Sequence, residues 1–218
     1  MFSEKIVLLK KGIIDYAEHV EKMIVESLER TMKRDEAVLH NIIEKEEAVA
    51  NRYEIEFDEI CVNYIARYQP AGKNLRMIIS AIKMSNDLER MADHAVNIAQ
   101  NGLFLISHPF VKPFIDIPKM SEITVSMLKN AIKSFVDEDM HLAKKVLEND
   151  GEVDSLKIKT VDEITYIMSE EPKTVSRALK IINIVSNLER VADLATNICE
   201  DVIYLTDGMI VKHHQADA

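Results

Sequence analysis

The chain has 218 residues, and its 37 Asp and Glu against 27 Lys and Arg give a net charge of −10 at pH 7. This acidic balance argues against a nucleic-acid backbone as the main partner, because phosphate contacts require clustered cations. No apolar run approaches the roughly 20 residues that span a bilayer, and the N-terminus lacks a signal-peptide pattern. Cys61 and Cys199 form no spaced metal motif and indicate reduced thiols. We therefore expect a cytoplasmic protein that meets a membrane only through partner proteins.

Hydrophobic periodicity predicts three helices in the first half, over residues 3–33, about 36–68 and about 74–106. Asp35 follows the first of them and is suited to cap the start of the second. Gln69-Pro70 and Gly72 interrupt the pattern before the third helix begins. In the third helix, residues at alternating spacings of four and three form an apolar seam typical of helix bundles: Met77, Ala81, Met84, Leu88, Met91, Ala95, Ile98 and Gly102.

A proline-rich segment divides the chain, since Pro109, Pro113 and Pro118 exclude a helix interior there. The same order then repeats, with helices predicted at about 119–136, from a turn at 137–139 to about 169, and at about 174–205. A polar tail with His213 and His214 follows. We predict an all-α fold of two tandem antiparallel three-helix bundles: residues 1–108, a linker at 109–118, and residues 119–218.

One motif occurs twice, one hundred residues apart. Residues 87–98 read Asp-Leu-Glu-Arg-Met-Ala-Asp-His-Ala-Val-Asn-Ile, and residues 187–198 read Asn-Leu-Glu-Arg-Val-Ala-Asp-Leu-Ala-Thr-Asn-Ile. In each copy a Glu and an Asp lie one helical turn apart and repel one another unless something neutralises them. The preceding helices offer oxygen side chains at matching distances from their own proline breaks. The candidate site residues are therefore Glu47, Asn51, Glu89 and Asp93 in the first half, and Asp150, Asp154, Glu189 and Asp193 in the second.

Two interpretations of these carboxylates remain open. In one, they are border residues that pair with Lys or Arg from a neighbouring helix. In the other, each bundle gathers about four oxygen ligands, a set that suits iron(III), manganese, magnesium or calcium better than zinc. The second half offers four carboxylates and the first offers three with the neutral Asn51, so this count predicts tighter metal binding in the second half. Arg90 and Arg190 are expected to pair with a nearby motif acid.

With these motifs, the chain resembles the PhoU family, accessory regulators of phosphate-specific transport. The family mark, Leu-Glu-Arg-Ile-Gly/Ala-Asp-x-Ala-x-Asn-Ile, is matched at 88–98 and 188–198, and the runs at 172–177 and 198–205 agree as well. The resemblance implies a dimeric or oligomeric negative regulator that couples a phosphate ABC transporter to a sensor histidine kinase. It also implies metal clusters, iron among them, at the eight candidate residues.

Two other functions are alternatives to a regulator without catalysis. A carboxylate-bridged di-iron or ferritin-like enzyme needs a Glu-x-x-His pattern on two helices, and this sequence has it once, at Glu138 and His141. The other alternative is a purely structural helical adaptor in which the acidic sites hold no metal.

Overall fold

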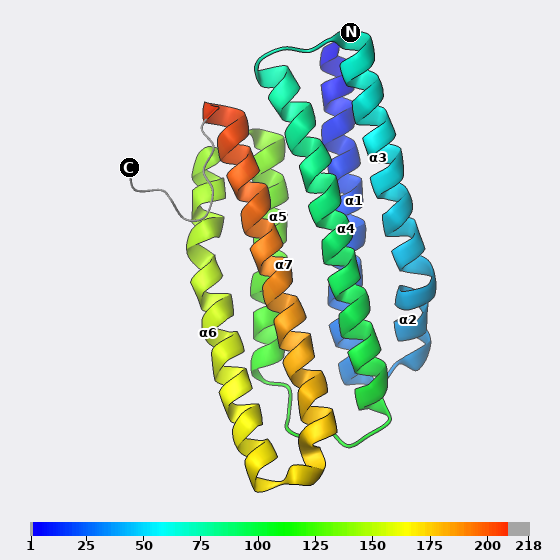
Figure 1. Cartoon of the computed structure of the whole chain (residues 1–218), viewed down its shortest axis with the longest axis vertical. Helices are drawn as coiled ribbons and strands as arrows, with labels where there is room; N and C mark the ends of the chain where they lie inside the picture. The colour runs from blue at the N-terminus through cyan, green and yellow to red at the C-terminus, as the bar shows by residue number, and fades with distance from the viewer. Residues whose placement is uncertain (1, 209–218) are drawn as a thin grey trace.

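The computed structural model describes residues 2–208, and within them it contains helices and turns but no strand (Figure 1). The polar tail, with His213 and His214, lies outside the described residues. A π-helical turn at Ile42–Glu46 joins α2 to α3, and a short 3₁₀ turn at Pro172–Thr174 precedes α7. The α-helices are α1 (Phe2–Lys33), α2 (Glu36–Asn41), α3 (Glu47–Tyr68), α4 (Lys73–Ile106), α5 (Asp116–Asp137), α6 (Met140–Glu170) and α7 (Val175–Asp207).

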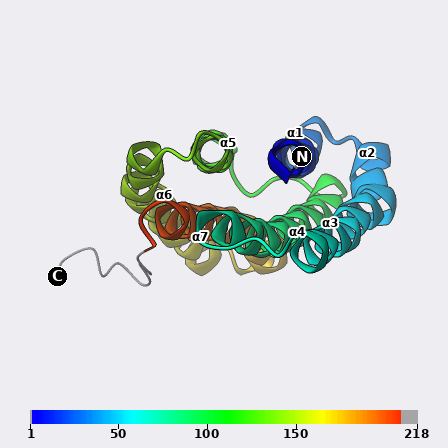
Figure 2. The ribbon, with the colours of Figure 1, turned by 90° about the horizontal axis from the view of Figure 1, so that it is seen from above.

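The helices form the two predicted three-helix bundles. The α2 and α3 helices act as one interrupted helix, so α1, α2–α3 and α4 make the first bundle and α5, α6 and α7 make the second. The two bundles meet mainly where α4 packs along α7, with α1 and α5 lying on one side of this pair (Figure 2). Hydrogen bonds join His94 to Asn187 (2.8 Å) and Lys83 to Asp201 (2.6 Å). Residue numbers rise along α4 as they fall along α7, so the two helices are antiparallel.

The predicted apolar seams form the core. Every residue of the α4 seam is buried, as is its α7 counterpart: Ile181, Ile184, Leu188, Val191, Ala195, Ile198 and Val202. Gly102 allows α1 to approach α4 closely, because a Cβ at this position would lie 2.0 Å from the Thr31 hydroxyl oxygen. Asp35 and Asp139 cap α2 and α6 with side-chain oxygens that accept backbone N–H bonds, as the prediction for Asp35 required.

The π-helical turn was not predicted, and it accounts for a one-residue shift in register between α2–α3 and α6. Before this turn, equivalent buried residues lie 104 positions apart, as Leu39 and Ala143 do. After it they lie 103 positions apart, as Ala50 and Val153 do. A π-helical turn holds one extra residue within an α-helix, so it returns α3 to the register of the second bundle. His19 supports the turn by donating from its ring Nε2 to the Glu46 carbonyl at 3.0 Å.

The linker is shorter than predicted, because α5 begins at Asp116 and not near residue 119. Pro118 is the third residue of α5, where a backbone N–H has no partner within the helix and proline is tolerated. Arg34 donates to the carbonyls of Ile106 and His108 and lies over the Phe110 ring. These contacts hold the start of the linker against the α1–α2 turn. No helix within residues 2–208 combines the length and apolar character needed to cross a bilayer.

Candidate functional site

The first motif lies where α3 meets α4. Glu89 is half-buried at the border of the bundle, and its pKa is raised, first by burial and then by the charges of Asp93 and Glu54. Glu47 has a smaller effect on the same carboxyl group. Asn51, the fourth predicted residue, is exposed on α3. The acid on α3 that acts most strongly on Glu89 is therefore Glu54, which the sequence analysis did not select.

Glu54 was detectable from spacing. It follows Glu47 by seven residues, and side chains separated by seven residues lie on the same face of a helix. The predicted site includes only Glu47 and Asn51 from this helix, because they match Asp150 and Asp154 in the second half. Asn86 on α4 donates from its side-chain amide to Glu54 Oε1 at 3.4 Å, and this bond holds the Glu54 side chain against α4.

A buried phenol lies behind the first acidic cluster. Tyr16 on α1 is fully buried, and its ring stacks on Tyr53 with the centroids 4.9 Å apart. Its hydroxyl has no hydrogen-bond partner. Burial raises the pKa of this phenol far above its ordinary value, and the charges of Glu54, Glu89 and Asp93 raise it further. Tyr16 is thus a neutral hydroxyl within electrostatic range of three carboxylates.

The second motif lies where α6 meets α7 and contains a lysine. Lys157 on α6 places its Nζ 2.9 Å from Glu189 Oε1, and only 12% of the Glu189 side chain is exposed. Arg190 adds two contacts, from Nε to Glu189 Oε2 at 3.8 Å and from a guanidinium nitrogen to Asp193 Oδ2 at 3.2 Å. Asp193 has a raised pKa because of burial and the charge of Glu189, with a smaller contribution from Asp154. Here the pairing of border carboxylates with cations, one of the two open interpretations, is observed.

The two motif arginines bind differently. Arg190 pairs with the motif acids, as expected, whereas Arg90 pairs with Asp87 at 3.4 Å. Asp87 is only 7% exposed. Burial raises its pKa to about 6, although Arg90 opposes the shift. The equivalent residue in the second half is Asn187, which has no charge to attract Arg190 and bonds to His94 across the bundles.

The predicted ligands share faces but do not converge. Asp150 and Asp154 are half-buried on α6, one turn apart, and the charge of Asp154 acts on Asp193 of α7. Across residues 2–208, no three His, Cys, Asp or Glu side chains come close enough together to hold a metal ion. The donors are all oxygen, which suits a hard cation, and the orphaned Tyr16 hydroxyl adds a polar atom to the first set. The first cluster therefore has fitting donor chemistry, but its side chains would have to turn inward around a metal.

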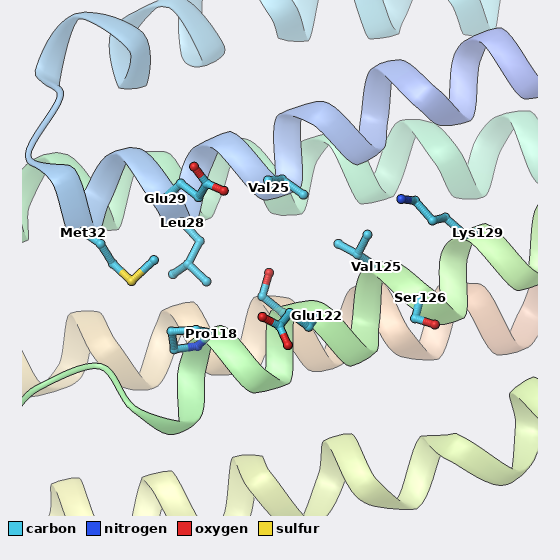
Figure 3. Close-up of a pocket in the computed structure, with 10 residues that line it drawn as sticks. Val25, Leu28, Glu29, Met32, Pro118, Glu122, Val125, Ser126 and Lys129 are labelled. Atoms are coloured by element: carbon cyan, nitrogen blue, oxygen red, sulfur yellow. The ribbon is translucent and has the colours of Figure 1, made fainter.

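Three surface depressions lie outside the predicted site. One is a polar hollow of about 570 Å³ between α3, α4 and α7, lined by Glu54, Asp58, Lys83, Asn86, Asp87 and Asp201 among others. A groove between α1 and α5 contains the other two, of about 470 and 410 Å³. Figure 3 shows the larger of these, with Val25, Leu28 and Val125 between the helices and Lys129 at one side. Only the polar hollow includes a residue of the first acidic cluster, Glu54.

Comparison with known proteins agrees with this repeated architecture. A family model described as the PhoU domain matches the chain twice, at residues 13–102 and 117–202. The chain belongs to the PhoU family. Both matched ranges contain one complete copy of the motif, and the linker falls between them. The resemblance inferred from the motifs is confirmed.

Relatives match the chain over most of its length. The phosphate-specific transport system accessory protein PhoU homolog 2 of Thermotoga maritima is 34% identical over 97% of this chain and 90% of its own. The PhoU homolog of Aquifex aeolicus is 36% identical over 94% of this chain and 92% of its own. The crystal structure of PhoU from Pseudomonas aeruginosa covers 96% of this chain and 100% of its own, with a TM-score of 0.90 and 30% identity.

The position of Glu138 argues against the ferritin-like alternative. This residue lies in the turn between α5 and α6, where Lys10 and Lys73 both pair with its carboxylate. Burial alone would raise its pKa, but the hydrogen bonds from these lysines lower it overall. His141 is exposed at the start of α6. The Glu-x-x-His pattern thus belongs to a salt-bridged turn that fastens α1 and α4 to the second bundle, away from the bundle interior where di-iron ligands project.

Proposed function

We propose that this PhoU-family chain is a non-enzymatic, cytoplasmic regulator of phosphate uptake. It would bind a phosphate ABC transporter, couple it to a sensor histidine kinase, and repress phosphate-starvation genes when phosphate is plentiful. The observation that carries this proposal is the pair of PhoU-domain matches, at residues 13–102 and 117–202. Relatives that match most of the chain are named accessory proteins of phosphate-specific transport, which supports the same role.

The charged surface supports a role in protein contacts. Arg90, Asp93 and Arg190 belong to the repeated motif, yet the first two are exposed and 64% of the Arg190 side chain is accessible. Exposed charge of this kind steers association and sets specificity for a partner more than it adds affinity. We also propose that the protein forms a homodimer or a higher oligomer. Light scattering of the purified protein measures the molar mass that tests this.

Metal binding at the acidic motifs is the second part of the proposal. The candidate ligands are Glu47, Asn51, Glu89, Asp93, Asp150, Asp154, Glu189 and Asp193, and iron is the first metal to test, with manganese, magnesium, calcium and zinc as alternatives. A bound cation would join α3 to α4, or α6 to α7, by neutralising carboxylates that otherwise repel. The donor chemistry supports this role, because carboxylate oxygens are the ligands that hard cations prefer.

The regulatory role is tested by complementation. A bacterium that lacks its own PhoU is supplied with this gene, and a phosphate-starvation reporter is measured in phosphate-rich medium. We expect the raised reporter signal of the deletion strain to fall, and affinity purification in the same cells to recover the transporter and the kinase. A reporter that stays high, together with recovery of neither protein, would refute the regulatory proposal.

A further inference from the structure

The groove between α1 and α5 has two equivalent halves. Buried residues of these helices correspond at an interval of 104 residues, as Tyr16 and Met120 do, and as Leu28 and Ile132 do. Ion pairs between the two sides show that residue numbers rise along α1 as they fall along α5, so the helices are antiparallel. Every α1 residue that lines the larger hollow has its equivalent on the α5 side of the smaller one. The two hollows are thus copies of one another, related by the internal repeat.

The groove has an apolar floor that no other helix covers. Both hollows are lined by α1 and α5 alone. Among the lining residues, Ile14, Val25 and Met32 of α1 and Val136 of α5 are only half-buried. From Ile14 to Met32 the groove extends about 28 Å, because an α-helix rises about 1.5 Å per residue. This length matches an α-helix of about five turns.

Acidic side chains border this apolar floor. Five acids and two lysines line the hollows, and both lysines already pair with lining acids. Glu18 and Glu122 are exposed, and neither forms an ion pair within residues 2–208. These two acids lie 104 residues apart, so they are equivalent, and each hollow has one of them. The groove therefore favours an apolar ligand that brings its own positive charge.

An ion pair divides the groove into its two hollows. Lys129 lines both of them and extends from α5 to place its Nζ 3.0 Å from Glu21 Oε1 on α1 (Figure 3). Because 59% of the Lys129 side chain is exposed, this pair adds little to stability and is readily exchanged. A ligand that displaces Lys129 would leave Glu21 as a third acid for a cation of the ligand.

We propose that this groove binds an amphipathic α-helix of a partner protein, with its apolar side chains on the floor and Lys or Arg beside Glu18 and Glu122. Apolar anchors three and four residues apart are the usual basis of such helix-in-groove binding. A second copy of this chain is a poor occupant, because its net charge of −10 would add to the acidic rim. The inference rests on the proposed regulatory function and deepens it, since it gives the chemistry of the partner segment.

The spacing of the two acids limits the pattern of that helix. Since Glu21 pairs with Lys129, Glu18 lies level with about residue 132 of α5, roughly ten residues or about 15 Å from Glu122. The acids are also on opposite walls, one on α1 and one on α5. The cations of the bound helix therefore belong on opposite flanks of its apolar stripe, about nine or ten residues apart.

The experiment measures binding of synthetic peptides of about 18 residues by fluorescence anisotropy at physiological ionic strength. Each peptide carries a hydrocarbon staple, because an isolated helix of this length is marginal in water. The first has a Leu stripe flanked on both sides by Lys, the second has Glu in place of Lys, and the third has the composition of the first with the stripe scrambled. Light scattering of each protein accompanies the titrations.

Two protein variants alter the groove in different ways. The double variant Glu18→Lys with Glu122→Lys reverses the rim charge, and Asp15→Lys with Glu148→Lys makes the same net change at exposed positions outside the groove. Val25→Trp fills the larger hollow, and its control is Ile55→Trp, on α3, where 59% of the residue is exposed. Circular dichroism verifies that each variant is helical, and Val25→Trp provides the test if the double variant does not fold.

We expect wild-type protein to bind the Lys-flanked peptide at least about tenfold more tightly than the other two, since complementary charge and an apolar stripe are both required. The rim double variant and Val25→Trp should each weaken this binding at least about tenfold, and the two controls should bind like wild type. In the complementation strain, the rim double variant should fail to lower the reporter signal that its control lowers.

Absence of peptide binding to wild type, or equal binding by wild type and both groove variants, would overturn the inference. A wild-type dimer that becomes a monomer in both groove variants would also overturn it, because a second copy would then occupy the groove. If wild type lowers the reporter and the rim double variant lowers it equally, the regulatory function stands and the groove has no part in it. If the peptide binds as expected but wild type leaves the reporter high, the groove is a helix-binding site and the regulatory function fails.

Discussion

Deleting a single residue from the π-helical turn should be tolerated, and the same deletion in α6 should not. Glu44 lies in this turn, and its equivalent in α6, at the interval of 104, is Glu148. Both are exposed glutamates, so each deletion removes one negative charge from the surface. Deletion of Glu44 removes the extra residue of the first half and leaves the buried positions on both sides of the turn in register. The helix should then continue as a regular α-helix.

The cost of each deletion follows from the buried residues. Deleting Glu148 rotates the start of α6 by about 100° relative to the rest, because an α-helix has 3.6 residues per turn. That rotation turns Ala143 and Val146, which are 0% and 1% exposed, away from the core. Losing the burial of these side chains costs about 2–4 kcal/mol. Deleting Glu44 instead loses the bond from His19 to the Glu46 carbonyl and gains a regular helical bond, so it should change stability by less than about 1 kcal/mol.

Thermal unfolding followed by circular dichroism measures the difference between these variants. For a chain of this size, 2–4 kcal/mol corresponds to a melting temperature lower by roughly 4–16 °C. We expect that decrease for the Glu148 deletion and a change of at most a few degrees for the Glu44 deletion. If both deletions were equally costly, the π-helical turn would not be the place where the register of the two halves is restored.

Three further predictions concern single side chains. Gly102→Ala should destabilise the fold by about 1–3 kcal/mol, because the added methyl group meets the Thr31 hydroxyl and overpacks the α1–α4 contact. Equilibrium denaturation measures the free energy of unfolding, and an unchanged value would refute this prediction. Glu138→Gln should lower the free energy of unfolding by about 1–2 kcal/mol at pH 7. The folded-state pKa of Glu138 lies below the ordinary value of 4.5, so the difference from wild type should shrink only as the pH falls below that value. Denaturation at several pH values measures this difference, and one that does not depend on pH would contradict the prediction. Tyr16→Phe should stabilise the protein by about 1 kcal/mol, since it removes an unpaired buried hydroxyl. A loss of stability would show that the hydroxyl is paired.

Local pattern predicted most of this fold correctly. The apolar seams of α4 and α7 alternate at spacings of four and three, and this spacing is a property of the helix itself. Asp35 predicted its cap because an Asn, Asp, Ser or Thr side chain satisfies the free N–H groups at any helix start. The predicted start of α5, at about residue 119, was wrong by three residues, because proline limits a helix interior but not its first turn. These features depend on neighbours within a few residues.

The charges of the candidate site were harder to predict, because they come from residues outside the repeated pairs of carboxylates. Glu54 and Lys157 lie at the same interval of 103 residues as Glu47 and Asp150, but one is an acid and the other a base, so no repeated pattern marks them. The pairing of Arg90 with Asp87 follows from a difference just outside the shared motif, where the other copy has Asn187. Repeated residues thus identified the site, and unrepeated residues beside them set its charge.

The most direct measurement of the central claim, that this chain represses phosphate-starvation genes, is the reporter signal of a bacterium whose own PhoU gene has been replaced by this one. We predict a low signal in phosphate-rich medium, as in the parent strain. A signal as high as that of the deletion strain would contradict the account.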